Sequence, residues 1–443
     1  MTEIEDRAAL VAGSDRRDLA LSCIEAGIAA ARPDRIVRES ITLEGDRLEV
    51  AGETVDLGEY RRVVVLGGGN AAAYVADALE SVLGDRLDGG VVVTDDPVET
   101  ETVDVLPADH PIPSTRGVAS TRRLLDAAAE ADSDTLVLGV ITGGGSATMA
   151  APAGDVTLAD LQATTRALLR SGASIHEINA VRKHCSSIKG GHLAAALAPA
   201  RTVSLVFSDV VGNDLDVIAS GPLVPDGSTF DEAHEVLARH DVDVPESVRD
   251  RLEAGAAGDV AETPSAGNRI FDPVSTHVLA DGYTALEAAA DAARRRGHEP
   301  IVLSSRFEGD PATLGETHAA IAAEATATGS PVAPPAVLLS GGETTVAHAG
   351  DGRGGPNQEF VLGAALATDV PATVAAVDTD GVDGTADAAG AILDADGDVD
   401  APAGDRALES HDVAPYLAGQ DATIETGPTG TNVNDLRVVV LPA

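Results

Sequence analysis

Five short runs of β-branched and aliphatic residues, each ending in glycines, acids or hydroxyl residues, constrain the fold of this chain most. They alternate with Ala- and Leu-rich stretches of helical character, which is typical of an α/β protein with mainly parallel sheets. With the polar residues that follow, the runs occupy 61–70, 135–146, 202–214, 335–345 and 373–384. Ligands of doubly wound sheets bind beyond the carboxyl ends of strands, so these ends are candidate site positions.

The spacing of the runs predicts two α/β lobes with a shared cleft. Three runs lie before residue 215 and two lie after residue 335. The segment 253–269, "EAGAAGDVAETPSAGNR", is rich in Ala, Gly and Pro and is the expected linker. We therefore expect an N-terminal domain over 1–255 and a C-terminal domain over 268–443, which opens with a strand–helix–strand unit at 275–305.

The charge balance excludes several classes of partner. The chain has 72 acidic and 30 basic side chains, a net charge of −42, so we expect it to bind neither nucleic acid nor a membrane surface. The acids are spread along the chain and do not form a tail. This pattern indicates adaptation to molar salt, where the Debye length is about 3 Å. The alternative is an ordinary acidic soluble enzyme.

Other composition features predict a cytoplasmic protein. Cys23 and Cys185 form neither a disulfide framework nor a metal-ligand pattern. The start "MTEIEDRAAL" lacks the basic-then-apolar pattern of a signal peptide. No run approaches the ~18–20 apolar residues of a membrane span. The oligomeric state stays open, a homodimer included.

Two glycine-rich loops are candidate phosphate sites. "GGGNAA" brings Gly67, Gly68, Gly69 and Asn70 to the end of the first run, in the form G-x-G-x-x-A, with Asp95 after the next strand. This is the dinucleotide-binding pattern, although a tight turn or another anion site would also explain it. "TGGGSATM" brings Gly143, Gly144, Gly145 and Ser146 to the end of the second run, where successive N–H groups can form an anion nest or a simple turn.

Only two of the basic residues are lysines, Lys183 and Lys189, and both lie in "HEINAVRKHCSSIKGGH". If 176–189 is helical, one face of that helix carries Asn179, Arg182, Ser186 and Lys189. We expect Lys183 at the edge of this cationic face, and the helix to end at Gly190 and Gly191. Cations near a helix C-terminus also complement its dipole, but arginine would serve that purpose equally. A lysine ammonium can follow a moving phosphoryl group as a point charge.

Acidic side chains follow two further runs. "SDVVGNDLDV" contains Ser208, Asp209 and Asp214, and "DTDGVDG" contains Asp378, Asp380 and Asp383. Carboxylates at strand ends suit Mg²⁺ held together with nucleotide phosphates, or a base that activates a substrate hydroxyl. In so acidic a chain, a chance cluster of acids is the alternative.

Taken together, these segments resemble the glycerate 2-kinase family, whose second domain is called MOFRL. The resemblance runs in the family's order from about residue 60 to the end of the chain. In the first half it is carried by "ADHPIPS" (108–114), "ITGGGSATMAAPA" (141–153), "IHEINAVRKHCSSIKGGHLA" (175–194) and "SDVVGNDLDVIASGPLVPDGSTF" (208–230). In the second half it is carried by "SGGETTV" (340–346), "GRGGPNQEF" (352–360), "DTDGVDG" (378–384) and "PTGTNVNDLRV" (428–438).

The resemblance implies a Rossmann-like N-terminal domain, a MOFRL C-terminal domain and an active site in the cleft between them. It implies a kinase that uses ATP and Mg²⁺ to phosphorylate D-glycerate to 2-phospho-D-glycerate, and the acidic composition indicates a member of haloarchaeal type. Phosphoryl transfer needs positioning and charge neutralisation, which the cationic face can supply.

The resemblance also suggests a role for each candidate residue. Catalytic roles fall to Lys189, Lys183, Arg182 and Asp209, the last as base. Nucleotide or phosphate binding falls to the two glycine loops and Asn179. The role of binding Mg²⁺ falls to Asp378, Asp380 and Asp383. Substrate binding and completion of the site from the second lobe fall to Ser208, Asp214, Glu343, Asn357, Thr431, Asn432 and Asp435.

Two departures from the family pattern leave the substrate open. Asn70 stands where the family commonly has lysine, and Pro356 stands where it has arginine. A kinase for another small hydroxy acid is therefore one alternative. An NAD(P)H-dependent hydroxypyruvate reductase is another, supported by "GGGNAA" with Asp95. A non-enzymatic binding protein for an anionic metabolite is the third.

Overall fold

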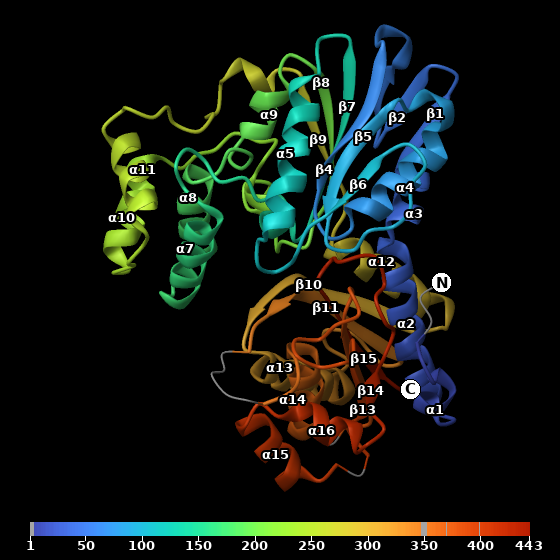
Figure 1. Cartoon of the computed structure of the whole chain (residues 1–443). Helices are drawn as coiled ribbons and strands as arrows, with labels where there is room; N and C mark the ends of the chain where they lie inside the picture. Colours follow the sequence, from blue (N-terminus) through green and yellow to red (C-terminus); the bar gives the residue numbers. More distant parts are fainter. Residues whose placement is uncertain (1–3, 347–351, 369, 398) are drawn as a thin grey trace. The chain divides into compact units, whose positions relative to one another are not determined.

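The computed structural model in Figure 1 describes residues 4–346, 352–368, 370–397 and 399–443. The chain forms two compact units. Residues 36–279 make up one, called here the middle unit. Residues 1–35 and 280–443 together make up the other, called here the terminal unit.

This grouping differs from the expected boundaries in two places. The first 35 residues group with the C-terminal part of the chain, because helix α2 (Asp15–Ala31) packs into the core of the terminal unit. The expected linker, 253–269, lies within the middle unit, and part of it belongs to helix α11 (Glu246–Ala256). The chain passes from one unit to the other at the end of strand β9 (Val274–Ala280). The expected strand–helix–strand unit at 275–305 is therefore divided between the two units.

The middle unit is built on a six-stranded sheet with the order β6-β5-β4-β7-β8-β9. All its recorded strand pairs, from β6 to β8, are parallel, as the sequence predicts. The chain goes from β4 through β5 to β6 on one side, then returns to β7 on the other side of β4. Ligands of doubly wound sheets bind at such a switch point. The strand bounds are β4 Arg62–Gly68, β5 Gly89–Thr94, β6 Asp104–Pro107, β7 Thr135–Thr142 and β8 Arg201–Phe207.

Helices and a small antiparallel sheet surround these strands. Helices α5 and α9 share an apolar cluster with the sheet, and α8, α10 and α11 share a second cluster (Figure 1). The helices are α3 Pro33–Ser40, α4 Ala72–Leu83, α5 Thr115–Ala129, α6 Gly145–Thr148, α7 Leu158–Arg170, α8 Ile175–His184, α9 His192–Leu197 and α10 Phe230–Arg239. The small sheet is β1 Ile41–Glu44, β2 Arg47–Val50 and β3 Glu53–Asp56.

The terminal unit has a mixed six-stranded sheet, so the expectation of a mainly parallel sheet is wrong for this unit. In the order β10-β11-β15-β12-β13-β14, only β10 and β11 pair in parallel. The last strand, β15, inserts antiparallel between β11 and β12, and β13 and β14 continue the antiparallel pairing. The strand bounds are β10 Glu299–Gly309, β11 Ala336–Thr344, β12 Thr373–Asp378, β13 Gly390–Asp394, β14 Thr423–Ile424 and β15 Asp435–Leu441.

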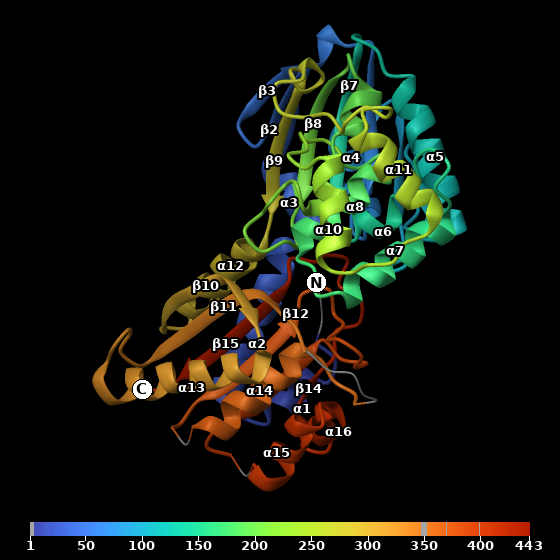
Figure 2. The same ribbon diagram turned by 90° about the vertical axis from the view of Figure 1, so that its left-hand side faces the viewer.

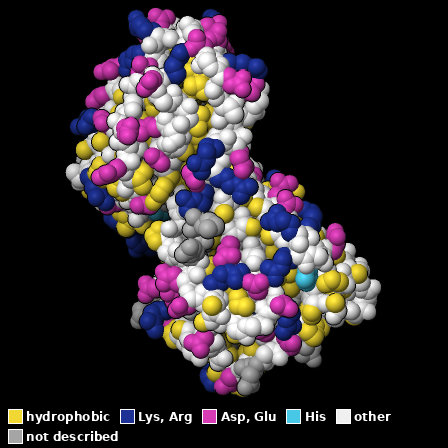
Figure 3. Space-filling model, turned by 90° about the vertical axis from the view of Figure 1, so that its right-hand side faces the viewer, with side chains coloured by type: hydrophobic (Ala, Val, Ile, Leu, Met, Phe, Trp, Pro, Cys, Tyr) yellow, Lys and Arg dark blue, Asp and Glu magenta, His cyan; other side chains and the backbone are white. Residues whose placement is uncertain are grey.

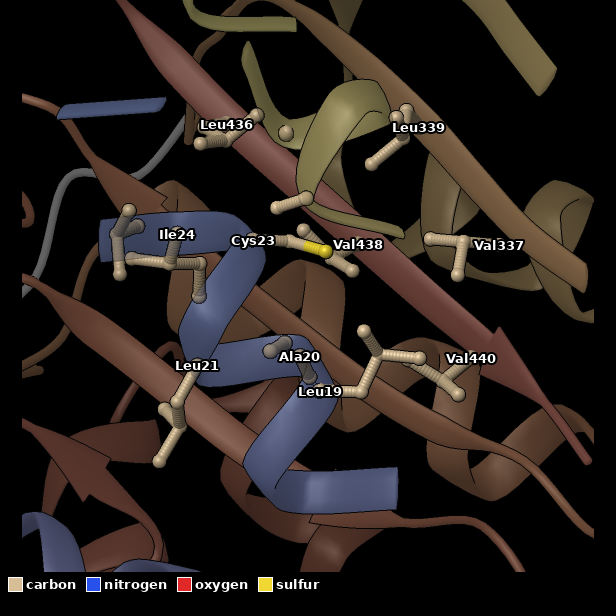
Figure 4. Close-up of a cluster of buried hydrophobic side chains, with 14 of the residues drawn as sticks. Leu19, Ala20, Leu21, Cys23, Ile24, Val337, Leu339, Leu436, Val438 and Val440 are labelled. Carbon is tan, nitrogen blue, oxygen red and sulfur yellow. The ribbon is translucent and has the colours of Figure 1, made fainter. Parts of the chain in front are cut away.

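Both faces of this mixed sheet are covered by helices. Helices α2 and α12 cover one face, and Figure 4 shows Leu19 and Cys23 of α2 lying against Val438 and Val440 of β15. Helices α13 and α14 share the other apolar cluster and lie side by side in Figure 2. The remaining helix bounds are α1 Arg7–Val11, α12 Gly282–Arg295, α13 Pro311–Thr328, α14 Pro356–Ala367, α15 Ala401–Glu409 and α16 Val413–Ala418.

Charged side chains of both signs lie on the surface (Figure 3). Figure 3 shows acidic and basic groups interspersed over the face in view, which agrees with acids spread along the sequence. Among the helices in the described part of the chain, none has the length and apolar content to cross a membrane.

We predict that Gly67→Ala destabilises the middle unit. A Cβ at Gly67 would come within 1.8 Å of the Val140 carbonyl oxygen on the neighbouring strand. Overpacking of this kind costs about 3 kcal/mol, which urea unfolding would detect. Gly258→Ala is the control, because its Cβ would meet nothing within 4 Å and only the left-handed backbone, φ +81°, opposes it. Equal losses of stability in the two variants would contradict the prediction.

Candidate active site

The two glycine loops meet at the switch point between β4 and β7. The Asn70 backbone N–H donates to the Gly143 carbonyl, with 2.8 Å between N and O. The Asn70 side chain lies over Gly144, where a Cβ would come within 1.8 Å of Asn70 Oδ1. At the end of β8, the Asp209 carboxylate lies over Gly143 in the same way, 2.0 Å from the position of a Cβ. The structure thus brings both loops and Asp209 together.

The first glycine loop owes its glycines to strand packing. Gly67 and Gly68 lie inside β4, not in the turn after it. A Cβ at Gly68 would come within 2.6 Å of the Val93 carbonyl oxygen, and one at Gly69 within 2.2 Å of Thr142 Oγ1. Close approach of β5 and β7 therefore explains these glycines without a bound pyrophosphate.

The predicted helix over 176–189 ends a turn early. Helix α8 spans Ile175–His184 and is capped at its start by Ser174 and Glu177. After it, the chain bonds to 151–153: the Ala153 N–H donates to the Cys185 carbonyl, and the Ser187 N–H donates to the Ala151 carbonyl. The expectation that Asn179, Arg182, Ser186 and Lys189 share one helical face is therefore wrong. Only the first two of these residues lie on α8.

Lys183 lies in the interior rather than at the edge of a cationic face. Its side chain is 1 % exposed and pairs with Asp216 and with the buried Asp226, 3.2 Å away. Burial opposes ionisation of Asp226, but the Lys183 ammonium lowers the pKa of this carboxyl below its usual value. Asp226 also accepts hydrogen bonds from Ser228 and Thr263. These ion pairs therefore give Lys183 a structural role and not one of contacting a ligand.

Lys189 has a different environment, although it is also buried. Its ammonium donates to the carbonyl oxygens of Ser146 (2.8 Å) and Met149 (3.2 Å), at the end of the second glycine loop. Burial, with the nearby charge of Arg182, lowers the pKa of Lys189 to about 7. Burial also lowers the pKa of Arg182. Over the described ranges of the chain, no carboxylate pairs with either cation.

A residue absent from the sequence predictions links the glycine loop to α8. The hydroxyls of Ser146 and Ser220 lie 2.6 Å apart, and the Ser220 hydroxyl donates to Asn179 Oδ1 at 3.0 Å. Ser220 belongs to "IASG", a stretch whose left-handed backbone has no sequence signal except its glycine. Together with Lys189 and Arg182, these residues form what we call the cationic cluster.

Two other predicted residues of the middle unit have local roles. Ser208 is buried at the end of β8 and bonds to Val210. Asp214 is exposed, and its carboxylate accepts the backbone N–H of Asp216. This contact within its own loop does not bring Asp214 to the cationic cluster.

In the terminal unit, Asp383 caps a helix. Its carboxylate oxygens accept the N–H groups of Asn357 and Gln358, the first residues of α14 after Pro356, both at 2.9 Å. Burial raises the pKa of Asp383 to about 7, and the two N–H donors oppose that rise. Both oxygens are thus engaged by the helix, which leaves Asp383 poorly placed for the metal role that the sequence suggested.

Next to this cap lies a buried ion pair. Asp435 accepts from Asn357 Nδ2 at 2.6 Å, pairs with Arg437, and accepts the N–H of Thr344. Arg437 is fully buried and lies over the Phe360 ring, 5.4 Å from its centroid. The sequence analysis missed Arg437, although it lies two residues after Asp435 in "NDLRV" and so on the same face of β15.

Asp378 and Asp380 lie together at the end of β12. The Asp380 N–H donates to Asp378 Oδ1 at 3.0 Å. Burial, followed by the charges of Asp380 and Asp435, raises the pKa of Asp378 well above its usual value. Within the described parts of the chain, no group of three or more His, Cys, Asp or Glu side chains is arranged to hold a metal ion. We call Asp378, Asp380 and Asp435 the acidic cluster.

The other predicted residues of this unit lie around the acidic cluster. Asn432 Nδ2 lies 3.5 Å from Asp380 Oδ2. Thr431 is buried and donates to the Ala31 carbonyl, which ties its turn to the end of α2. Glu343 is the exposed residue near the end of β11.

We predict that Lys183→Met destabilises the fold by about 3–5 kcal/mol, because it leaves the Asp226 carboxylate buried without its cation. Lys189→Met is the matched control, since its ammonium donates only to backbone carbonyls. Urea unfolding at neutral pH would compare the two. A loss of stability in Lys189→Met as large as that in Lys183→Met would contradict this assignment.

We also predict that Lys189 makes stability depend on pH. Its folded-state pKa of about 7 lies below the ordinary 10.5, so the unfolded chain binds more protons between these values. The free energy of unfolding should therefore rise with pH from about 7 to 10.5. Unfolding curves of the wild type and Lys189→Met across this range would isolate the contribution. The prediction would be contradicted if the free energy of unfolding changed with pH in the same way in the wild type and in Lys189→Met.

The chain matches two family models: the domain of unknown function DUF4147 over residues 19–253, and the MOFRL family over residues 336–435. A glycerate 2-kinase from Pyrococcus horikoshii is 37% identical, over 96% of this chain and 98% of its own. A protein from Agrobacterium vitis that carries the provisional name hydroxypyruvate reductase is 42% identical, over 86% of this chain and 87% of its own.

Among solved structures, a crystal structure of glycerate kinase from Thermotoga maritima superposes with a TM-score of 0.83. It is 34% identical and covers 96% of this chain and 99% of its own. These matches extend over both units and include the motifs of both clusters. The chain therefore belongs to the glycerate kinase family with DUF4147 and MOFRL domains.

Proposed function

We propose that this protein uses ATP and Mg²⁺ to phosphorylate D-glycerate to 2-phospho-D-glycerate. The observation that carries the proposal is the cationic cluster. In a chain with a net charge of −42, Lys189 is buried and Arg182 is half-buried close to it, and neither has a carboxylate partner in the described residues. Burying two like charges is costly, and a bound anion offsets that cost. The named kinase relatives agree with this reading.

Phosphoryl transfer requires anion binding and positioning from the protein, and the cationic cluster suits both requirements. The second glycine loop lies beside it, since the Lys189 ammonium donates to the Ser146 carbonyl at the end of that loop. The neighbouring Asp209 is the candidate base that takes the proton of the reacting hydroxyl, because it is the carboxylate that lies against Gly143. Lys183 holds the surrounding segments in place.

The acidic cluster fits a magnesium ion that is shared with nucleotide phosphates. Mg²⁺ is commonly held by one or two carboxylates together with phosphate oxygens and water. Asp378 and Asp380 are adjacent carboxylates whose mutual repulsion a divalent cation would relieve. When bound, the ion would neutralise charge on the transferred phosphoryl group. Asn357 and Arg437 hold Asp435 beside these carboxylates.

A reduction of hydroxypyruvate with NAD(P)H is the second candidate, favoured by one specific observation. Asp95 directly follows β5, where dinucleotide-binding folds have their ribose-binding acid. Its Oδ1 is buried and has no hydrogen-bond partner among the residues that the structure describes. However, the glycines of "GGGNAA" are explained by strand packing. This reading also gives no role to the acidic cluster. An NADH-consumption assay with hydroxypyruvate tests it directly.

We predict that ³¹P NMR of the protein with D-glycerate, ATP and Mg²⁺ shows a 2-phosphoglycerate resonance. Lys189→Ala should reduce turnover by at least about 100-fold, since a buried cation that binds the reacting groups is worth several kcal/mol. The control is Arg249→Ala, which removes an exposed cation paired with Asp243. Because many acidic proteins need salt, the reaction should be run from low to molar KCl.

The outcomes separate the candidate functions. Intact ATP at every salt concentration, with the protein shown to be folded, would reject D-glycerate as the substrate. A Lys189→Ala variant with wild-type turnover would reject the assigned role of the cationic cluster. Turnover that persists after chelation of divalent ions would reject the magnesium role of the acidic cluster.

A further inference from the structure

The segment Ala219–Gly221 has an unusual backbone. All three residues adopt left-handed conformations, with φ values of 51°, 63° and 63°, and two of them carry a Cβ. Such strain persists where surrounding structure over-determines it, and it concentrates at functional sites. Here the N–H groups of Gly190 and Gly191 donate to the carbonyls of Ser220 and Gly221, at 2.9 and 2.8 Å. Ala219 also packs against Gly145, where an added Cβ would come within 2.6 Å of the Ala219 Cβ.

The result of this backbone is a fixed position for the Ser220 hydroxyl, which is fully buried between two side chains. A hydroxyl has one proton to donate. The Ser220 proton goes to Asn179 Oδ1, at 3.0 Å. In the 2.6 Å contact between the two serines, Ser146 must therefore be the donor. Ser146 is left with lone pairs only, so it can accept a hydrogen bond from a ligand but cannot donate one.

The same hydrogen bond fixes the Asn179 amide. With Oδ1 held by Ser220, the amide nitrogen Nδ2 points elsewhere. The Asn179 side chain is 2 % exposed, and within the described chain Nδ2 has no hydrogen-bond partner. A buried donor without a partner is costly, so it indicates a group that binds there. One helical turn further along α8 lies Arg182, on the same face of the helix.

The cluster therefore offers a defined pattern: donors and positive charge from Asn179, Arg182 and Lys189, next to one acceptor at Ser146. A nest for a bare phosphate would consist of donors only. An acceptor next to anion-binding donors suits a hydroxy acid, with the carboxylate on the donors and a hydroxyl on Ser146. Because Asp209 is the candidate acceptor for the proton of the reacting 2-hydroxyl, the hydroxyl of D-glycerate that suits Ser146 is the one on C3. Ser146 is partly exposed, so a small ligand can reach it.

We propose that Ser220 is a positioning residue for hydroxy-acid recognition: it holds Ser146 as the acceptor for the non-reacting hydroxyl of the substrate and Asn179 as a donor to the substrate carboxylate. This inference rests on the proposed function, since it assigns the cationic cluster to the hydroxy acid and not to the nucleotide. Ser220 touches neither ligand.

The test compares Ser220→Gly, Ser220→Ala and Ala219→Gly. Both Ser220 variants lack the hydroxyl, but glycine suits a φ of 63° and alanine does not, so Ser220→Gly should be the more stable of the two. Ala219→Gly relieves strain at the adjacent position and keeps the hydroxyl. In both Ser220 variants the KM for D-glycerate should rise about 10- to 100-fold. The KM for ATP should stay the same. Ala219→Gly should keep wild-type values for both substrates.

A binding measurement makes the test independent of turnover. Calorimetry without ATP would compare D-glycerate with propionate, which has a carboxylate but no hydroxyl. The wild type should prefer D-glycerate, and the preference should shrink in both Ser220 variants, because Ser146 then regains a free proton and is no longer held as an acceptor. If the wild type binds D-glycerate but does not phosphorylate it, the proposed function fails and this inference still stands.

Three results would overturn the inference. One is a Ser220→Gly variant that keeps the wild-type KM for D-glycerate and the wild-type preference over propionate. Another is a rise in the KM for ATP in place of that for D-glycerate, which would assign the cluster to nucleotide phosphates. The third is an equal loss in Ala219→Gly, which would make backbone conformation, not the hydroxyl, the cause.

Discussion

The buried ion pair of Lys183 with Asp216 and Asp226 is the interaction on which the middle unit's site depends. Lys183 lies on α8, and its two partners flank the strained segment that contains Ser220. One ammonium thus fixes that segment relative to the helix that carries Asn179. The position of Lys189 depends on the same segment, because the Ser220 carbonyl accepts the N–H of Gly190, the residue after Lys189. We therefore assign complementary roles to the two lysines: Lys183 holds the scaffold, and Lys189, which has no carboxylate partner among the described residues, belongs to the proposed anion site.

The sequence predicted the fold class and the positions of the strand ends well, because those depend on local patterns. The five runs correspond to β4, β7, β8, β11 and β12. Non-local pairing was not predictable: nothing in β15 shows that it inserts between β11 and β12, or that α2 joins a sheet more than 300 residues away. The two glycine loops were found by composition. The sequence could not show that the glycines of the first loop are required by contact with neighbouring strands, because that contact is non-local.

The candidate site was predicted in part for similar reasons. Charged residues that follow strands are visible in a sequence, and Asp378 and Asp380 do lie at the end of β12. Arg182 and Lys189 were found by their charge, and they lie on α8 and after its end. A helical pattern could not show that α8 ends at His184, since tertiary hydrogen bonds to 151–153 stop it. Residues that act through others, such as Ser220 and Arg437, carry no motif of their own. Their roles follow from hydrogen-bond partners and burial.

The discontinuous make-up of the terminal unit has a consequence for synthesis. Its core joins α2 to β15, which leaves the ribosome after every other strand of that sheet. The middle unit is complete in sequence once Leu279 has emerged, so it can fold while the chain is still growing. Until the last strand emerges, the apolar face of α2 lacks β15, one of the strands it packs against in the finished core. The apolar side chains of α2 are therefore a site of possible aggregation for most of the translation of the chain.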